Sequence, residues 1–409
     1  MKAVVFHAPG DIRLDEVAEP KISTPNDAIV RLTANAICGT DLHAVRGTMG
    51  GMQSGTILGH EGVGIVEEVG SAVRNFKRGD RVVLPSTIAC GNCSYCRAGY
   101  FSMCDQSNPN GKDSGTAFYG GPKDSGPFNG MQAERVRVPF ANVNMYKLPP
   151  EVTDDQAIMI SDIFPTGYMG AEMAEICPGR SVAVFGCGPV GQFAIASAKL
   201  MRAGRIFAVD TVASRLEMAQ AQGAEVIDFN REDPIEVIQG LTSGIGVDRV
   251  IDAVGVDADT AHHGPAQKSA KQHQPEYDDE RKKVVKKSGE HGDNWHAGDA
   301  PSQVLDWAVQ VMAKAGTLSI IGVYPETVRV FPIGEAMGKN LTVRMGNCHH
   351  MRYIPLLVQL VRTGAVDPTE ILTQVEPLTS AIEAYKQFDL RQPGWIKVKL
   401  EPSAPAKAA

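Results

Sequence analysis

The chain has 409 residues, of which 43% are hydrophobic and 21% are charged, and its formal net charge at pH 7 is −7. This length predicts two or three globular domains, and the negative charge argues against nucleic acid or an anionic membrane as a partner. No apolar run reaches the roughly 18–20 residues that cross a bilayer, and the N-terminus lacks the features of a secretory signal. We therefore expect a cytoplasmic protein that acts on a small molecule.

The first 150 residues contain short β-type runs separated by turns rich in glycine and proline. This pattern predicts a β-rich, barrel-like domain. Strands are expected at Lys2–Phe6, Ala28–Leu32, Ile65–Val69 and Arg81–Leu84.

From about residue 155, runs typical of buried strands alternate with runs typical of helices. This alternation predicts an α/β domain with a doubly wound parallel sheet. The expected strands are Ser181–Phe185, Arg205–Asp210, Glu225–Phe229, Asp248–Val254 and Thr317–Val323. Helices are expected at Val190–Met201 and Ser214–Gln222.

Residues 256–300 interrupt the alternation. They contain six lysines between Lys268 and Lys287, mixed with acidic residues and few apolar ones. This composition predicts a mobile surface loop that ends at a helix near Ser302. A flap over a bound cofactor is the alternative.

Beyond residue 350, helices are expected at Tyr353–Arg362 and Thr379–Phe388, followed by a strand at Trp395–Leu400. The final residues, 402–409, are expected to form a frayed tail.

Four cysteines are closely spaced in the pattern C-x2-C-x2-C-x7-C: Cys90, Cys93, Cys96 and Cys104. Tight turns can direct several thiolates at one point, which suits a tetrahedral zinc ion. An iron–sulfur site is a rival, but its bacterial pattern continues with x3-C-P, whereas Asp105 follows the fourth cysteine here. Disulfides are a third reading, although such close pairs would close strained loops. We expect a structural zinc with no open coordination position.

A glycine-rich motif of the form G-x-G-x-x-G follows the expected strand Ser181–Phe185. Its residues are Gly186, Cys187, Gly188, Pro189, Val190 and Gly191. Because it opens a helix and Asp210 ends the next strand about 20 residues later, it predicts a dinucleotide site, with the pyrophosphate at the helix N-terminus. Asp210 would accept hydrogen bonds from the adenosine ribose and repel a 2′-phosphate, which favours NAD over NADP.

Two further local motifs are candidates for a second metal site. Cys38 follows a strand-like run, and His60 lies between Gly59 and the glycines at 62, 64 and 70. A thiolate, an imidazole and one further ligand would leave zinc with an open position, as in catalytic sites. A buried thiol and a hydrogen-bonded core histidine are the alternative, but the glycines favour a ligand site.

The stretch from Gly59 to Gly70, G-H-E-x2-G-x5-G, resembles the zinc motif of the medium-chain dehydrogenase/reductase superfamily. The cysteine cluster and the later Rossmann pattern match the same superfamily. The resemblance implies a GroES-like catalytic domain over 1–160, a Rossmann NAD-binding domain over 161–348 with an insertion at 256–300, and a return to the catalytic domain over 349–409. It also implies that Cys38 and His60 are zinc ligands, with Glu61 as a neighbouring or exchanging ligand.

The third ligand is expected to be Asp162, in the sequence Asp162-Ile-Phe-Pro-Thr-Gly-Tyr168. Many alcohol dehydrogenases have a cysteine at this position, and the aspartate form looks like the glutathione-independent formaldehyde dehydrogenase branch. A carboxylate is a harder ligand than a thiolate and would make zinc a stronger Lewis acid. Capping of the following helix by Asp162 is the alternative. Met169 departs from this branch, where a histidine is expected.

The resemblance assigns further roles. Thr40 and His43 would relay the proton that leaves an alcohol, and an imidazole suits this task because its pKa lies near neutrality. Thr166 and Val190 would lie near the nicotinamide, and Arg215 would contact the adenosine ribose. His349 and His350 are interpreted as structural.

The expected function is zinc-dependent hydride transfer between a primary alcohol or aldehyde and NAD, with two zinc ions per chain and with formaldehyde as one candidate substrate. A zinc-dependent dehydrogenase of polyols, sugars or secondary alcohols is the alternative. A zinc-stabilised binding protein without catalysis is a third reading, which the combination of Cys38, Thr40, His43, His60 and Asp162 opposes. The resemblance suggests a homodimer or homotetramer.

Overall fold

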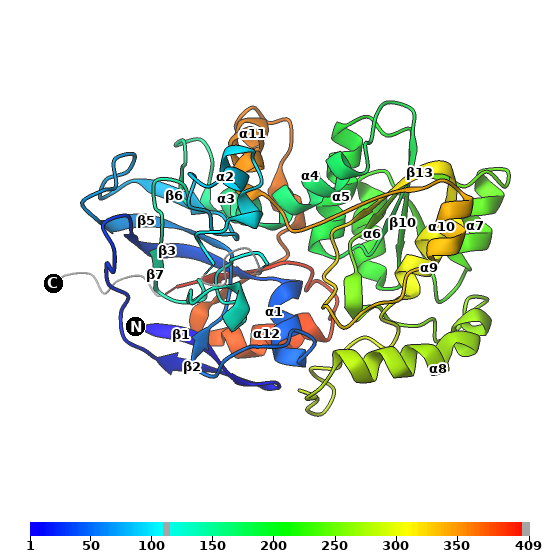
Figure 1. Cartoon of the computed structure of the whole chain (residues 1–409), viewed down its shortest axis with the longest axis horizontal. Coiled ribbons are helices and arrows are strands. Elements are labelled where there is room, and N and C mark those ends of the chain that lie inside the picture. The colour runs from blue at the N-terminus through cyan, green and yellow to red at the C-terminus, as the bar shows by residue number, and fades with distance from the viewer. Residues whose placement is uncertain (109–114, 403–409) are drawn as a thin grey trace. The chain divides into compact units, whose positions relative to one another are not determined.

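The computed structural model describes residues 1–108 and 115–402 (Figure 1). Apart from Pro402, the expected C-terminal tail lies outside the described residues. The chain forms two compact units. Unit 1 comprises Met1–Pro165, Ser288–Trp295 and Cys348–Ala409, and unit 2 comprises Thr166–Lys287 and His296–Asn347.

The described part of unit 1 is built around two β-sheets. The smaller sheet has the order β2 (Asp11–Glu16), β1 (Lys2–Ala8), β4 (Thr56–Ile57). The larger sheet has the order β15 (Gln374–Pro377), β16 (Val398–Glu401), β3 (Ala28–Ile37), β5 (Gly62–Val69), β6 (Arg81–Leu84), β8 (Tyr146–Lys147), and β7 (Arg135–Val138) also pairs with β3. The β-rich first domain predicted from the sequence is confirmed.

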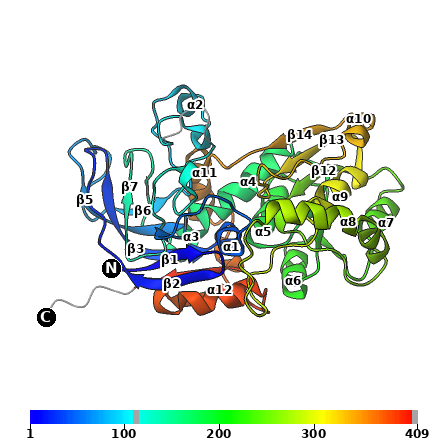
Figure 2. The same ribbon diagram turned by 60° about the horizontal axis from the view of Figure 1, so that its bottom comes forward.

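Short helices cover these sheets. The α-helices are α1 (Gly39–Arg46), α2 (Ser94–Arg97), α3 (Asp154–Ser161), α11 (His350–Arg362) and α12 (Ala381–Asp389). The 3₁₀ turns are η1 (Phe101–Met103), η3 (Lys123–Ser125), η5 (Pro368–Ile371) and η6 (Leu378–Ser380). Helix α12 packs against β2 (Figure 2) and against β16. Its buried residues Tyr385 and Phe388 join Val4, Leu42 and Leu400 in one apolar core.

Unit 2 is a doubly wound parallel sheet. Its strand order is β11 (Glu225–Asp228), β10 (Arg205–Asp210), β9 (Ser181–Phe185), β12 (Val247–Asp252), β13 (Met312–Ile320), β14 (Thr342–Met345). All neighbouring strands are parallel, and the order in which the chain adds strands reverses between β9 and β12, which is the switch point where such sheets bind dinucleotides. The helices are α4 (Ile163–Met173, which begins in unit 1), α5 (Pro189–Leu200), α6 (Ala213–Ala221), α7 (Pro234–Leu241), α8 (Gln267–Val284), α9 (Gln303–Val311) and α10 (Ile333–Gly338), with a 3₁₀ turn η4 (Gly255–Asp257).

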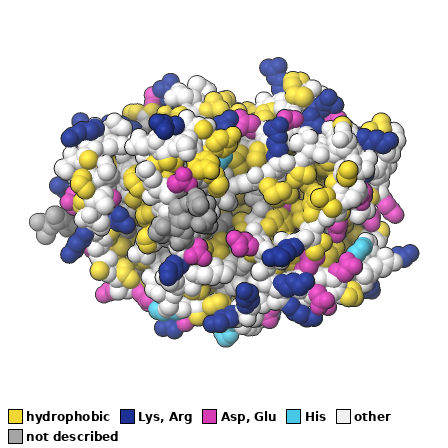
Figure 3. Space-filling model, viewed as in Figure 1, with side chains coloured by type: hydrophobic (Ala, Val, Ile, Leu, Met, Phe, Trp, Pro, Cys, Tyr) yellow, Lys and Arg dark blue, Asp and Glu magenta, His cyan; other side chains and the backbone are white. Residues whose placement is uncertain are grey.

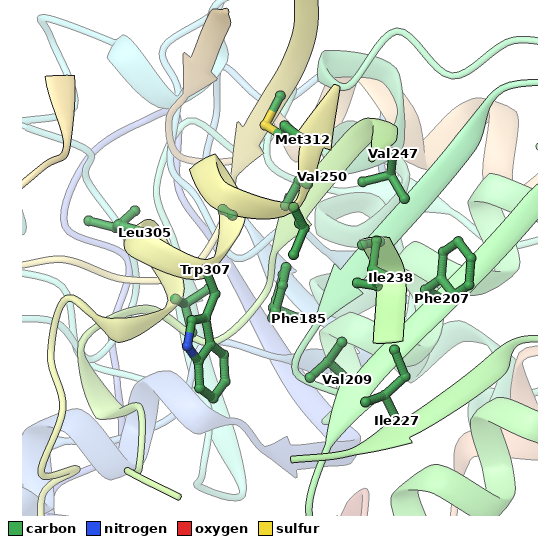
Figure 4. Close-up of a cluster of buried hydrophobic side chains, with 14 of the residues drawn as sticks. Phe185, Phe207, Val209, Ile227, Ile238, Val247, Val250, Leu305, Trp307 and Met312 are labelled. Atoms are coloured by element: carbon green, nitrogen blue, oxygen red, sulfur yellow. The ribbon is translucent and has the colours of Figure 1, made fainter. Parts of the chain in front are cut away.

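Alternate residues of the central strands serve two separate cores, as strand geometry requires. In β9 and β10, Phe185 and Phe207 pack with Trp307 of α9 on one face of the sheet (Figure 4). Val184 and Ala208 point to the other face and pack with α5 and α6. Both faces are therefore covered by helices, which explains why the strands read as continuous apolar runs.

The insertion at 256–300 differs from the predicted loop, because α8 occupies its middle. The buried residues of α8 are Ala270, Tyr277, Glu280 and Val284. Their spacing places them on one narrow face of a helix, while the remaining positions are mostly polar or charged and are exposed or half-buried. The low average apolar content concealed this narrow stripe, and the prediction of a loop was therefore wrong.

The end of the insertion, Ser288–Trp295, belongs to unit 1 and is anchored there by Asp389 of α12. The backbone N–H of Trp295 donates to Asp389 Oδ2 at 2.7 Å, and Arg46 Nη2 lies 2.8 Å from Asp389 Oδ1. The Trp295 side chain is buried in the core that contains Leu42 and Val45 of α1. The insertion thus supports the helix that follows Cys38.

Charges of both signs are interspersed over the face shown in Figure 3. Among the described residues, no helix is both long and apolar enough to cross a membrane.

We predict that Trp295→Ala lowers the free energy of unfolding by about 3–5 kcal/mol, because a large buried side chain is lost from a packed core. Chemical denaturation followed by circular dichroism measures the change. Asp293→Ala is the matched control, since Asp293 is exposed two residues away, and we expect a change below about 0.5 kcal/mol. Equal unfolding curves for the two variants would show that the segment is not anchored as described.

Candidate functional site

The pairing of β3 with β5 brings Cys38 and His60 together. The two strands are antiparallel, with Asn35 opposite Gly62. Cys38 follows the last residue of β3, and His60 lies two residues before β5, so both side chains leave the same end of the strand pair. A Cβ at position 64 would lie 2.3 Å from the carbonyl oxygen of Arg31, so the close approach of the strands requires glycine there.

Four donor groups converge at this end of the sheet. One ligand atom from each of Cys38, His60, Glu61 and Asp162 lies within 4.8 Å of the others. Asp162 Oδ2 is 3.6 Å from Cys38 Sγ and 3.3 Å from His60 Nε2. Ligands of a tetrahedral zinc are separated by about 3.4 Å, from the usual zinc–ligand bond lengths. The donor set therefore fits a zinc ion.

A carboxylate that the sequence analysis did not single out orients His60. Asp41 Oδ1 lies 3.2 Å from His60 Nδ1, which directs Nε2 towards Cys38 and Asp162. Asp41 Oδ2 accepts hydrogen bonds from the Cys38 backbone N–H at 3.0 Å and from Gln132 Nε2 at 3.1 Å. Carboxylates commonly orient metal-binding histidines in this way. Asp41 could have been found as an acidic residue in the first turn of the helix after Cys38.

His350 also belongs to the site, contrary to its interpretation as an ordinary structural histidine. Its Nε2 lies 2.6 Å from Asp162 Oδ1 and its Nδ1 lies 3.0 Å from Thr87 Oγ1. His349 lies beside the cysteine lobe, with Nδ1 2.8 Å from Ser102 Oγ. Asp162 itself ends α3. The sequence signal that could have indicated a site residue here is the pair of histidines directly after Cys348.

Glu61 pairs with a lysine that lies 336 residues away in the sequence. Lys397 Nζ hydrogen-bonds Glu61 Oε2 and donates to the Ile37 carbonyl at 3.1 Å. Both side chains of the ion pair are fully buried. Glu61 Oε1 is buried and has no hydrogen-bond partner among the described residues, which is consistent with an atom that faces a cation.

The electrostatics of the cluster favour a positive charge at its centre. Burial alone would lower the pKa of His60, but the charges of Asp41 and Cys38 outweigh burial and raise it well above its usual value. Burial would raise the pKa of Asp162, but hydrogen bonds from His350 and His60 lower it well below its usual value. Burial raises the pKa of Cys38 and of Glu61. A metal cation could take the place of the protons held here.

The two residues expected in a proton relay lie on α1. His43 is buried, with Nδ1 2.9 Å from Thr48 Oγ1. Thr40 lies in the first turn of α1 and is half-buried. Thr48 was not identified from the sequence.

The four cysteines at 90–104 form a second convergent cluster. Their sulfur atoms lie within 4.8 Å of one another, and Cys93 Sγ is 3.9 Å from Cys104 Sγ. Thiolates around a tetrahedral zinc are separated by about 3.8 Å. The N–H groups of Asn92 and Cys93 donate to Cys90 Sγ. Burial would raise the pKa of Cys104, but hydrogen bonds from Ser107 and Cys90 lower it to about 7.

In unit 2, the glycine motif forms a tight turn between β9 and α5. Gly186 has a φ of +85°, and a Cβ at position 191 would lie 1.8 Å from the Gly186 carbonyl oxygen. Gly188 is the N-cap of α5 and Pro189 its first residue. A Cβ at position 188 would meet only Arg215, at 3.9 Å. The motif thus leaves open space in front of a helix N-terminus, where an anion binds well.

Asp210, at the end of β10, holds this turn. Its Oδ2 accepts a 2.7 Å hydrogen bond from the Cys187 N–H, and its Oδ1 accepts from the N–H groups of Thr211 and Val212. Arg215 Nη1 lies 3.8 Å from Asp210 Oδ2. Val190 lies in the first turn of α5. Thr166 lies in α4, and the residue after it, Gly167, packs directly on the α5 backbone.

Comparisons with known proteins agree with this geometry. The family described as the alcohol dehydrogenase GroES-like domain matches residues 24–150, and the zinc-binding dehydrogenase family matches residues 189–262. An uncharacterized zinc-type alcohol dehydrogenase-like protein of Bacillus subtilis is 37% identical over 406 residues, which cover 98% of this chain and 100% of that protein. The chain belongs to the zinc-dependent medium-chain dehydrogenase/reductase superfamily.

Two further relatives lie within this superfamily. The glutathione-independent formaldehyde dehydrogenase of Pseudomonas aeruginosa is 33% identical over 416 residues, with 96% of each chain covered. The solved structure of the alcohol dehydrogenase TADH from Thermus sp. ATN1 has a TM-score of 0.80 at 33% identity and covers 98% of this chain and 100% of that chain. The predicted fold, a GroES-like domain with a Rossmann domain, is confirmed. Membership makes the chain an oxidoreductase of the zinc-dependent alcohol dehydrogenase type and implies zinc and a nicotinamide cofactor.

We predict that Lys397→Met lowers the free energy of unfolding by about 3–5 kcal/mol, because it leaves the Glu61 carboxylate buried without its counter-charge. The double variant Lys397→Met/Glu61→Gln should recover most of the loss. Denaturant unfolding of the zinc-saturated protein provides the measurement. Lys386→Met is the matched control, since its ion pair with Glu383 is exposed and contributes at most about 1 kcal/mol. A Lys397 variant as stable as this control would contradict the prediction.

Proposed function

We propose that the protein is a zinc-dependent dehydrogenase that transfers a hydride between a primary alcohol or aldehyde and NAD. The observation that carries the proposal is the convergence of a sulfur, an imidazole nitrogen and a carboxylate oxygen from Cys38, His60 and Asp162. Three protein ligands of these kinds leave a tetrahedral ion one open position, which is the arrangement of catalytic zinc sites.

In this proposal, Cys38, His60 and Asp162 bind the catalytic zinc, and Glu61 lies beside it. A zinc ion held there supplies a Lewis acid that lowers the pKa of a bound hydroxyl group. Asp41 keeps the Nε2 of His60 directed at the metal. Lys397 neutralises one of the negative charges near the site.

His43 and Thr40 carry the proton to and from the substrate in this proposal. The contact between His43 Nδ1 and Thr48 Oγ1 at 2.9 Å fixes the orientation of the imidazole, as proton transfer at a defined atom requires. Thr40 precedes His43 by one helical turn on α1.

The cofactor in the proposal is NAD. Gly186, Gly188 and Gly191 leave room for the pyrophosphate at the start of α5, with Pro189 and Val190 beside it. Asp210 places a negative charge where the adenosine ribose would bind, which disfavours a 2′-phosphate. Arg215 and Thr166 would contact the ribose and the nicotinamide end, respectively.

A second zinc, bound by Cys90, Cys93, Cys96 and Cys104, completes the proposal. With four thiolate ligands it has no open position, so it stabilises the lobe and takes no part in the chemistry.

Formaldehyde or another small aldehyde is the preferred substrate in the proposal. Support comes from Asp162 in its Asp-Ile-x-Pro-Thr-Gly-Tyr context, together with the formaldehyde dehydrogenase relative at 33% identity. An alcohol dehydrogenase of Cupriavidus necator is about equally similar, at 32% identity, so the relatives do not single out aldehydes. A substrate among the polyols, sugars or secondary alcohols is the second candidate.

We predict that Cys38→Ser lowers turnover by more than about 100-fold, since even groups behind the ligands contribute about 10- to 100-fold. Turnover is measured as NADH absorbance with formaldehyde in the absence of glutathione, with short primary alcohols, and with polyols and secondary alcohols. The metal content should fall by about one zinc per chain.

Cys177→Ser is the matched control, because Cys177 is an exposed cysteine outside both clusters. Wild-type turnover in the Cys38 variant would sink the proposed mechanism. Turnover of polyols alone would favour the second candidate. A wild-type protein that holds a single zinc and turns over none of the substrates would indicate a zinc-stabilised binding protein without catalysis.

We further predict that Asp210→Asn shifts the cofactor preference towards NADP by about tenfold, which corresponds to about 1.4 kcal/mol of lost repulsion. The asparagine keeps an acceptor for the Cys187 N–H, so the turn should persist. The ratio of kcat/KM for NADP and NAD measures the change. A wild-type protein that already uses NADP as well as NAD would contradict the role given to Asp210.

A further inference from the structure

Two adjacent histidines contact two different metal-binding clusters. His349 lies against the cysteine lobe: its Nδ1 is 2.8 Å from Ser102 Oγ, and its ring centroid is 5.4 Å from that of Tyr100. Ser102 is in η1, between the third and fourth cysteines of the lobe, and is fully buried. A movement of the lobe would therefore move His349 as well.

His350 lies against the other cluster. Its Nε2 donates to Asp162 Oδ1 at 2.6 Å, and its Nδ1 is 3.0 Å from Thr87 Oγ1. Thr87 also donates to the Cys348 carbonyl oxygen at 3.3 Å. His350 is 2% exposed and Thr87 is 5% exposed, so water cannot readily replace these contacts.

The backbone explains how neighbouring side chains reach different sites. His349 is the N-cap of α11, with φ −87° and ψ 63°, whereas His350 is the first helical residue. Consecutive Cα atoms are only about 3.8 Å apart, so a displacement of one histidine is passed to the other with little slack.

We propose that His349 and His350 form a rigid link through which the four-cysteine lobe fixes the orientation of the Asp162 carboxylate. The inference rests on the proposed function, in which Asp162 is a zinc ligand. With Oδ1 held by His350, Oδ2 is the oxygen left to face His60 Nε2 at 3.3 Å and Cys38 Sγ at 3.6 Å. The lobe thereby contributes to metal binding at a site that none of its cysteines contacts.

Three variants of the full chain test the link. His350→Leu removes both of its hydrogen bonds, His350→Gln keeps a donor towards Asp162, and His349→Phe keeps the ring beside Tyr100 but loses the contact with Ser102. The readout is the rate at which each zinc-loaded variant releases metal to a coloured chelator. The visible spectrum after cobalt replaces the released zinc reports on ligand geometry.

We expect His350→Leu to release one zinc per chain about 10- to 100-fold faster than the wild type, the range known for groups behind metal ligands. His350→Gln should restore most of the difference, and His349→Phe should act in the same direction but less. Because both histidines act through Asp162, the double variant His349→Phe/His350→Leu should release zinc no faster than His350→Leu alone.

Leu356→Ala is the matched control, since Leu356 is a half-exposed residue of the same helix, and it should leave the release rate unchanged. A wild-type rate for His350→Leu overturns the link, and so do effects that simply multiply in the double variant. If His350→Leu does not fold, His350→Gln and His349→Phe decide the question. If the Cys38→Ser variant holds as much zinc as the wild type, the proposed function is overturned instead.

Discussion

The antiparallel register of β3 and β5 is the constraint on which the convergence of the candidate metal ligands depends. With Asn35 opposite Gly62, the residues that follow β3 and precede β5 emerge side by side. A shift of one residue would turn every side chain of a strand to the other face of the sheet, and His60 would then point away from Cys38. The glycine at position 64 protects this register because any side chain there would strike the β3 backbone. Gly64 therefore acts on strand pairing, and through the pairing it sets the positions of the candidate metal ligands.

Around this pair, the site is assembled from distant parts of unit 1, each contributing a buried polar group to another. Asp41 orients His60, Lys397 balances Glu61, and His350 holds Asp162. Such networks are stabilising only when nearly every member is paired. The exception among the described atoms of the cluster is Glu61 Oε1. An otherwise complete network with one unpartnered anionic oxygen is what a site for a cation requires.

The sequence predicted those parts of the site whose information is local. The cysteine lobe and the glycine turn are each contained in fewer than 20 residues, and their spacing alone indicates their geometry. His350 and Lys397 could not be predicted in this way, because they lie 188 and 336 residues from their partners. Helix α11 also begins three residues before the expected Tyr353, and His350 lies in that omitted first turn. The insertion was misjudged for a related reason, since its average composition concealed a four-residue buried stripe on α8.

The position of Ser288–Trp295 in unit 1 has a consequence for how this protein can be divided. The chain passes from one unit to the other after Pro165, Lys287, Trp295 and Asn347. Neither unit is therefore encoded by one uninterrupted stretch of the gene. A fragment that ends before residue 288 would lack the tryptophan that completes the core beside α1, and a chimera with a relative would have to exchange these eight residues together with the rest of unit 1. In this protein, the boundary used for domain exchange must follow the packing of the chain and not its linear order.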